Sequence, residues 1–240
     1  MRIPTILRPG ALAAIAFAAA CLPGGTAFAQ QAAYPSRAIT IVVPYPAGGS
    51  NDTFARQIAK ELGDELKQPV IIDNRPGAST NIGVSVMMQA KPDGYTIMQA
   101  ENAALLFNEH MFTKLPYKPA SDFTYIGTIG RFPVALVVHP DFPAKNVAEF
   151  VRYVKANPEK VSYASPGNGS PHHMAMELFK QKAGLSIVHV PYKGAAPAMS
   201  DVMGGQVPVM MLDLASGLSI IKSGKVRVLA IALPQRANAL

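Results

Sequence analysis

Short apolar runs rich in β-branched residues alternate along this chain with longer segments whose apolar residues recur every three or four positions. In the first such pair, an apolar run at 38–44 precedes a segment at 50–66 in which every fourth residue from Phe54 is apolar. The short runs predict strands and the longer segments predict amphipathic helices. This alternation predicts an α/β fold in which helices cover both faces of a parallel sheet.

The same pattern divides the chain into two halves. In the first half it predicts strands at 38–44, 69–73 and 95–98 and helices at 50–66, 80–90 and 103–111. The alternation breaks at a proline-containing stretch that starts at Lys114, and we place a crossing between domains near Arg131. It then resumes with strands at 134–139, 161–164, 187–191, 207–212 and 226–231 and helices at 147–156, 171–183, 195–203 and 215–222. We therefore expect two α/β domains, at 30–130 and 131–230.

The N-terminus has the features of a secretory signal peptide. A short basic segment, Met1 to Arg8, precedes an uncharged apolar run, and small residues lead to Ala29. The apolar run is shorter than the roughly 20 residues that cross a bilayer, which predicts cleavage after Ala29 rather than a retained anchor. Cys21, the only cysteine, lacks the leucine that usually stands three residues before a lipidated cysteine, so lipoprotein processing is the less favoured alternative. The cleaved chain would contain no cysteine and would fold without disulfides.

The charge pattern favours small anionic ligands. The sequence carries a net charge of +7 at pH 7. Its Lys and Arg residues are scattered, without the clusters that nucleic-acid binding requires. We therefore expect no nucleic-acid partner and an extracytoplasmic, soluble protein.

A glycine-rich loop, Pro44 to Asp52, follows the first predicted strand. Ligands bind parallel α/β sheets where strands end and helices begin. Gly48 and Gly49 would let the backbone approach a ligand, and the N–H groups of the next helix would favour an anion. The alternative is a tight turn in which Ser50, Asn51 or Asp52 caps the helix. No Gly-Lys-Ser/Thr follows, so this is not a Walker phosphate loop.

A similar loop at 163–173 ends in Ser170 and a pair of histidines. Ser170 lacks the Gly-x-Ser-x-Gly spacing of a nucleophile elbow. His173 and Glu177 stand four apart on a predicted helix, but the sequence marks no third metal ligand. We therefore interpret Ser170 as a helix N-cap that also donates to an anion, with His173 on the turn that faces the cleft.

Asp213 ends an apolar predicted strand, an unusual place for a carboxylate. It could accept a hydrogen bond from a ligand hydroxyl or amine, or it could cap the following helix, and we favour the cap.

Taken in order, these pieces resemble the extracytoplasmic solute receptors of tripartite tricarboxylate transporters, the Bug family. The resemblance rests on segments spread over nearly the whole chain after Ala29: Tyr34-Pro-Ser-Arg, Pro44-Tyr-Pro-Ala-Gly-Gly-Ser-Asn-Asp52, Asp73-Asn-Arg-Pro-Gly-Ala78, Lys91-Pro-Asp-Gly-Tyr95, Tyr163-Ala-Ser-Pro-Gly-Asn-Gly-Ser170 with His173, and Val190-Pro-Tyr-Lys-Gly194.

The resemblance implies a two-domain, clamshell-like periplasmic-binding-protein fold of the type II kind. It implies a monomeric periplasmic receptor, without cofactor, metal or catalytic residues, that passes a di- or tricarboxylate, an acidic amino acid or an aromatic acid to membrane permease subunits. By position, the resemblance implies the following ligand-binding residues: Tyr45, Ala47, Gly48, Gly49, Asp52, Asn102, Ser165, Gly169, Ser170, His173 and Asp213.

Members of this family usually continue well beyond the strand that matches 226–231. We therefore expect 231–240 to begin a return to the first domain whose remainder is missing from this sequence. A truncated chain of this kind would leave an edge of the first sheet uncovered.

Two other functions remain as alternatives. A receptor of the same kind could signal through a membrane sensor instead of delivering its ligand to a permease. An α/β hydrolase-like enzyme is less favoured, because Ser170, His173 and Asp213 lack the spacing of a known catalytic motif.

Overall fold

The computed structural model describes residues 33–237. The predicted signal peptide, its cleavage site after Ala29 and Cys21 lie outside the described residues, as do residues 238–240. Every helix and strand below belongs to one compact unit, Pro35–Leu240. None of the described helices is both long and apolar enough to cross a membrane.

The first sheet has three parallel strands. β1 (Ile39–Val43) lies in the centre, between β2 (Val70–Asn74) and β3 (Thr96–Met98). Because all three run in one direction, the loops that follow β1 and β3 leave the sheet at the same edge. The sequence predicted these strands and their parallel direction correctly.

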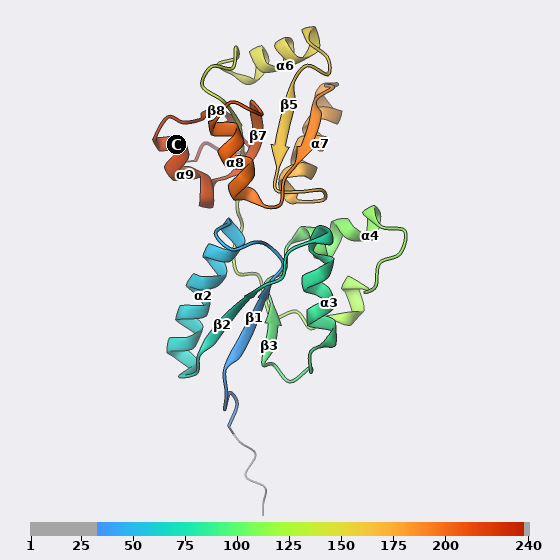
Figure 1. Ribbon diagram of the computed structural model, residues 1–240, viewed down its shortest axis with the longest axis vertical. Helices are drawn as coiled ribbons and strands as arrows, with labels where there is room; N and C mark the ends of the chain where they lie inside the picture. Colours follow the sequence, from blue (N-terminus) through green and yellow to red (C-terminus); the bar gives the residue numbers. More distant parts are fainter. Residues whose placement is uncertain (1–32, 238–240) are drawn as a thin grey trace, which may run out of the picture. The chain divides into compact units, whose positions relative to one another are not determined.

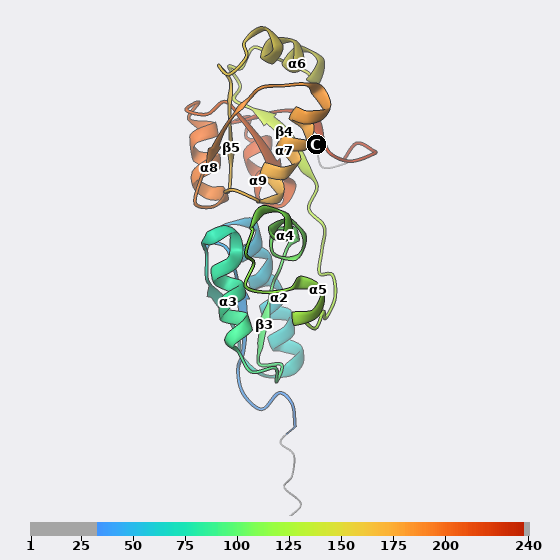
Figure 2. The same ribbon diagram turned by 90° about the vertical axis from the view of Figure 1, so that its right-hand side faces the viewer.

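Helices cover both faces of this sheet (Figures 1 and 2). On one face, Ala55 and Ala59 pack against Ile41 and Val43 of β1. On the other face, Val84 packs with residues from the segments that follow β3. The helices of this part are α2 (Ser50–Leu66), η1 (Ala78–Thr80), α3 (Asn81–Gln89), η2 (Ala103–Phe107), α4 (Asn108–Met111) and α5 (Pro119–Asp122).

The second sheet has five strands in the order β6-β5-β7-β4-β8. Its strands are β4 (Val134–Val138), β5 (Ser162–Ser165), β6 (Val188–Pro191), β7 (Val209–Asp213) and β8 (Arg227–Ile231). β5 runs parallel to β6 and β7, but β4 runs antiparallel to both β7 and β8. The expectation of parallel strands is therefore wrong for β4. This strand enters the sheet directly from the linker that follows the first sheet, without the crossover helix that a parallel connection needs.

Alternate residues of β4 point to opposite faces of the second sheet. Leu136 and Val138 pack in a core with α6 (Val147–Ala156) and α7 (Pro171–Ala183). Ala135 and Val137 pack in a second core, with the helices that cover the other face. Those helices are α8 (Ala195–Met203) and α9 (Leu214–Lys222).

The segment after β3 differs from the single helix predicted at 103–111. It begins with the π-helical turn η2 and continues as α4. π-Helical turns are rare and often accompany functional sites. Here the turn directly follows Glu101 and Asn102, which both line a pocket.

Candidate functional site

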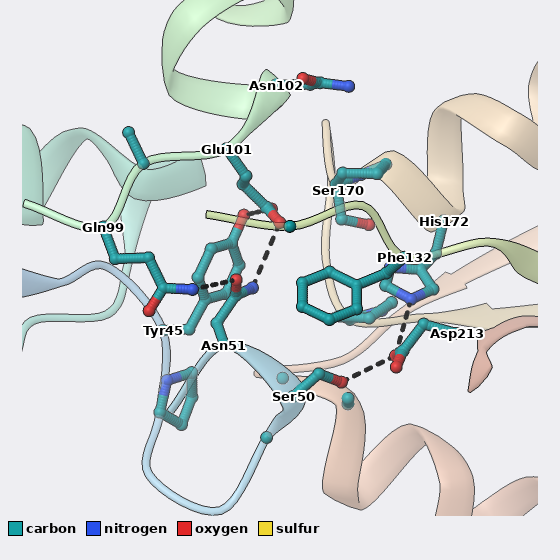
Figure 3. A pocket seen from close by; sticks show the side chains of 18 of the residues that line it. Tyr45, Ser50, Asn51, Gln99, Glu101, Asn102, Phe132, Ser170, His172 and Asp213 are labelled. Atoms are coloured by element: carbon teal, nitrogen blue, oxygen red, sulfur yellow. Dashed lines mark hydrogen bonds and ion pairs between the residues drawn. The ribbon is translucent and has the colours of Figure 1, made fainter. Parts of the chain in front are cut away.

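A pocket of about 680 Å³ lies where loops from both sheets meet (Figure 3). The loops after β1, β3, β5 and β6 contribute to it, as do the end of β7 and the linker that leads to β4. This is the strand-to-helix edge at which α/β sheets bind ligands. Its lining residues are Tyr45, Pro46, Ala47, Gly49, Ser50, Asn51, Gln99, Ala100, Glu101, Asn102, Leu105, Tyr125, Gly127, Thr128, Ile129, Gly130, Arg131, Phe132, Val134, Pro166, Ser170, Pro171, His172, Lys193, Gly194, Ala195, Ala196, Pro197 and Asp213.

The loop after β1 brings backbone to the pocket through Gly49. This residue is the N-cap of α2 and forms no side-chain cap. The first turn of a helix leaves its N–H groups unpaired, and their partial positive charge favours an anion. The alternative in which Ser50, Asn51 or Asp52 caps the helix is therefore not what the structure shows.

Asp52 does not line the pocket but is hydrogen-bonded to the backbone of this loop. Its buried carboxylate accepts hydrogen bonds from the Gly48 N–H (2.9 Å), the Asn74 amide (3.0 Å) and Arg56 Nε (2.9 Å). Burial alone would raise the pKa of Asp52, but these hydrogen bonds and the charge of Arg56 hold it below its usual range. With its oxygens occupied in this way, Asp52 fixes the shape of the loop.

Glu101 places a second carboxylate in the pocket, directly after β3. The Tyr45 hydroxyl donates to its Oε1, and the Asn51 amide donates to its Oε2 at 3.2 Å. Burial is the main cause that raises the pKa of Glu101 to about 7; the charge of His172 opposes this rise, and the negative charge of Asp213 adds a smaller part of it. Glu101 was not among the residues predicted from the sequence, although it stands next to the predicted Asn102 and three residues after the predicted strand at 95–98.

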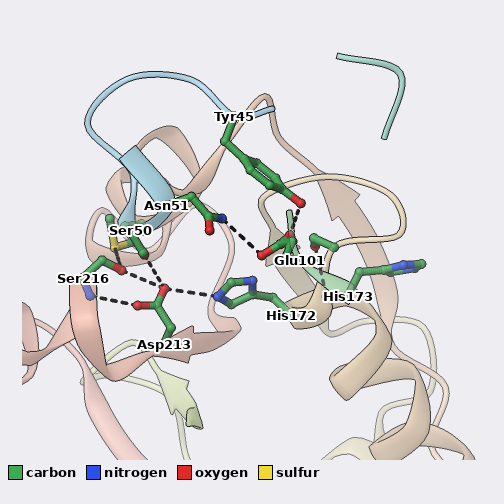
Figure 4. Close-up of polar contacts among 10 residues, drawn as sticks. Tyr45, Ser50, Asn51, Glu101, His172, His173, Asp213 and Ser216 are labelled. Atoms are coloured by element: carbon green, nitrogen blue, oxygen red, sulfur yellow. Dashed lines mark hydrogen bonds and ion pairs between the residues drawn. The ribbon is translucent and has the colours of Figure 1, made fainter. Parts of the chain in front are cut away.

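Asp213 collects hydrogen bonds from three elements (Figure 4). Its Oδ2 accepts from Ser50 Oγ at 2.7 Å and from Ser216 Oγ at 2.9 Å, and it lies 3.2 Å from His172 Nε2. Its Oδ1 accepts from the Ser216 N–H, so Asp213 caps α9 as predicted. Burial would raise its pKa, but the hydrogen bond and charge of His172 and the serine donors hold it well below the usual range.

This arrangement does not activate a serine. Ser50 and His172 both contact the same oxygen of Asp213, so the imidazole does not lie between acid and hydroxyl as a catalytic triad requires. The Ser170 hydroxyl donates to the Gly167 carbonyl at 2.8 Å. Ser165 lies 2.7 Å from His189 Nε2, but Ser165 is fully buried and does not line the pocket.

The eleven residues that the resemblance implied divide into two sets. Six of them line the pocket: Tyr45, Ala47, Gly49, Asn102, Ser170 and Asp213. The other five lie outside its lining: Gly48, Asp52, Ser165, Gly169 and His173. Ser170 is also the N-cap of α7, as predicted, and accepts from the His173 N–H at 3.3 Å.

His173 does not face the pocket, contrary to its interpretation from the sequence. Its ring stacks on that of His189 with centroids 4.2 Å apart, and its Nδ1 accepts from the Gly169 N–H at 3.2 Å. The preceding residue, His172, lines the pocket instead. One position on a helix turns a side chain by about 100°, and the sequence did not show which of the two histidines faces inward.

Two cations line the pocket without an ionic partner. Arg131 and Lys193 form no ion pair in the part of the chain that the structure describes. No group of three or more described His, Cys, Asp or Glu residues is placed to hold a metal ion. The described residues that line the pocket therefore include two exposed cations without an ion pair, the N-terminus of α2 and two carboxylates.

Comparison with known proteins places the chain in a family. Residues 54–240 match the model of the tripartite tricarboxylate transporter family receptor. BugT of Bordetella pertussis is 36% identical over 206 residues, which are 85% of this chain and 63% of BugT. The chain thus spans less than two thirds of the length of this relative.

Solved structures share the fold. The periplasmic binding protein BugD superposes with a TM-score of 0.79 at 33% identity, over 85% of this chain and 68% of BugD. Rpa4515 of R. palustris, solved with adipate, gives a TM-score of 0.82 at 35% identity, over 85% of this chain and 68% of that one. MatC of Rhodopseudomonas palustris, solved with bound malate, gives a TM-score of 0.76 at 32% identity, over 85% of this chain and 69% of MatC.

The chain thus has the α/β fold of periplasmic binding proteins. The match to the family model over most of its length shows that it belongs to the solute receptors of the tripartite tricarboxylate transporter family.

Proposed function

We propose that this chain is a periplasmic receptor that captures a small carboxylate and delivers it to the permease subunits of a tripartite tricarboxylate transporter. The observation that carries the proposal is the set of positive groups at one pocket. The uncapped first turn of α2, Arg131 and Lys193 all line it, and neither cation is paired within the described residues. Helix N-termini and free cations are the groups that bind carboxylates in proteins.

The ligands of related proteins support the same class of ligand. Two structural relatives that share about a third of their residues with this chain were solved with adipate and malate, both small dicarboxylates. The contacts within the pocket also favour binding over chemistry, because the hydroxyls of Ser50 and Ser170 donate to acceptors other than a histidine. We propose that Tyr45, Ala47, Gly49, Asn102, Ser170 and Asp213 contact the ligand, directly or through water.

Calorimetric titration of the chain with malate, adipate and other small acids tests the proposal. We expect saturable binding of one acid per chain, with the acid recovered chemically unchanged as measured by mass spectrometry. Conversion of the acid into a product would contradict the receptor function and favour an enzyme.

Delivery to a permease is tested separately. In membrane vesicles that contain the permease subunits, uptake of labelled acid should depend on added receptor. Light scattering of the purified chain in solution tests the proposed monomeric state. Binding without any effect on uptake would favour a sensor that acts through another membrane protein.

A further inference from the structure

Glu101 is held in place at the pocket by neutral donors alone. The Tyr45 hydroxyl and the Asn51 amide each donate to one carboxylate oxygen. Asn51 Oδ1 in turn accepts from Gln99 Nε2 at 3.2 Å, so the amide of Asn51 is oriented with its NH₂ group toward Glu101. Figure 3 shows Tyr45 and Asn51 bonded to the carboxylate, and Gln99 bonded to Asn51. Each oxygen of Glu101 retains capacity for a further donor.

Within the described residues, Glu101 differs from Asp213, the other carboxylate of the pocket, in forming no hydrogen bond or ion pair with a basic side chain. Asp213 lies 3.2 Å from His172 Nε2. Glu101 forms no ion pair, although Arg131 and Lys193 line the same pocket. A partly buried carboxylate without a cation is unfavourable, and a ligand that supplies the cation removes that cost.

We infer that the ligand carries a protonated amino group that binds Glu101, so that the receptor selects acidic amino acids over dicarboxylates that lack the amine. This inference rests on the proposed function, because it assumes that the same pocket binds carboxylates. An acidic amino acid has two carboxylates and one ammonium group. The ammonium group complements Glu101, and the carboxylates complement the N-terminus of α2 and the exposed cations Arg131 and Lys193 among the lining residues.

A simple dicarboxylate would satisfy Arg131 and Lys193 but leave Glu101 without a partner. Its own negative charge would also lie near that carboxylate, and like charges at short distance disfavour binding unless a proton is taken up. A hydroxyl group could donate to Glu101 but would not offset its charge. The amine is therefore the substituent that the pocket discriminates most strongly.

Matched ligand pairs provide the test. The chain is titrated at pH 8 with aspartate and succinate, and with glutamate and glutarate, which differ only in the amino group. We expect the amino acid of at least one pair to bind about tenfold or more tightly than its partner. Glu101→Gln should abolish this preference by weakening the binding of the amino acid. Glu109→Gln, which removes an exposed carboxylate on α4 outside the pocket, should retain the preference.

Proton linkage gives a second readout on the unmodified chain. The neighbours that face Glu101 are Tyr45 and Asn51 from the loop and helix after β1, His172 from α7 and Asp213 from β7. An ammonium group favours ionised Glu101, so binding near pH 7 should release protons. The difference in proton release between the unmodified chain and Glu101→Gln isolates the contribution of Glu101 from that of His172. Titrations in two buffers of different ionisation enthalpy measure this difference.

The outcomes separate the two proposals. Equal binding of the two members in both pairs, a preference that survives in Glu101→Gln, or binding of other small acids but of neither pair, would overturn the inference while the proposed function stands. Absence of binding by both members of each pair and by every other small acid would contradict the proposed function itself, and the inference with it.

Discussion

The hydroxyl of Ser50 donates a 2.7 Å hydrogen bond to Asp213 although the two residues are 163 positions apart in the chain. The bond joins the first residue of α2, the helix after β1 of the first sheet, to the last residue of β7 in the second sheet. Both residues line the pocket (Figure 3). It therefore connects the two parts of the binding site directly.

Ser50→Ala should weaken ligand binding. A hydrogen bond to a charged group contributes about 1.5 kcal/mol, which corresponds to about tenfold in affinity. Ser216→Ala is the matched control, because Ser216 donates to the same oxygen of Asp213 from α9, next to β7. Calorimetric titration should show the loss in the first variant only. Equal losses in both variants would mean that Ser50 acts only by orienting Asp213.

Gly49→Val should abolish binding and leave the protein folded. Gly49 has a φ of −85°, which any residue adopts, and a Cβ there would meet only the Pro46 carbonyl at 3.8 Å. The valine side chain would instead fill space in the pocket. Gly49→Ala is the graded control and should reduce affinity less. If Gly49→Val melts normally and binds as tightly as the unmodified chain, the loop after β1 is not the anion site.

Glu101→Gln should stabilise the protein above neutral pH. Burial raises the pKa of Glu101 from 4.5 to about 7 in the folded protein. Its protonated form is therefore favoured by folding, and stability is lost as the pH rises from about 4.5 to about 7. The variant avoids this loss, and we expect it to be about 2 kcal/mol more stable than the unmodified chain at pH 8, with little difference at pH 4. Urea unfolding at both pH values measures this, with Glu109→Gln as the control. A constant difference at both pH values would contradict the assigned pKa.

His189 should make the protein sensitive to acid. Burial and the charges of His173 and Lys180 lower the pKa of His189 to about 4, opposed by Glu177. Its ring stacks on Tyr163 and His173 and bonds Ser165. In acid the unfolded chain therefore binds more protons than the folded one. The contribution of His189 to the free energy of unfolding is complete above about pH 6.5 and is lost as the pH falls toward 4.

We expect the free energy of unfolding to fall by about 2 kcal/mol between pH 7 and pH 4.5. His173 contributes a smaller share, because burial lowers its pKa too. His189→Gln should flatten this slope in urea unfolding. His110→Gln, on the surface of α4, is the control and should leave it unchanged. A slope that persists in His189→Gln would assign the acid sensitivity to other groups.

Most helices and strands could be predicted from the sequence because the spacing of apolar residues differs between helices and strands. α2, α6, α7 and α8 have the bounds that were predicted, and the strands differ by one or two residues. The direction of β4 was not predicted, since alternation gives the order of elements but not their pairing. The limits of two domains at 30–130 and 131–230 remain a prediction.

The site was predicted only in part, for reasons of geometry. Strand-to-helix junctions located Gly49, Ser170 and Asp213 at the pocket. The choice between His172 and His173 depends on the rotation of α7, which two adjacent histidines do not reveal. Glu101 went unrecognised because its environment is made by Tyr45 and Asn51, about 50 residues earlier in the chain.

The most direct test of the account is a thermal melt of the chain against a panel of di- and tricarboxylates, acidic amino acids and aromatic acids. A ligand at 100 times its dissociation constant adds about 2.7 kcal/mol of stability, which raises the Tm by roughly 5 to 10 °C for a chain of this size. We expect such a rise with at least one acid and its loss in Gly49→Val. A cooperative melt that no acid of the panel shifts would contradict the claim that this chain is a carboxylate receptor.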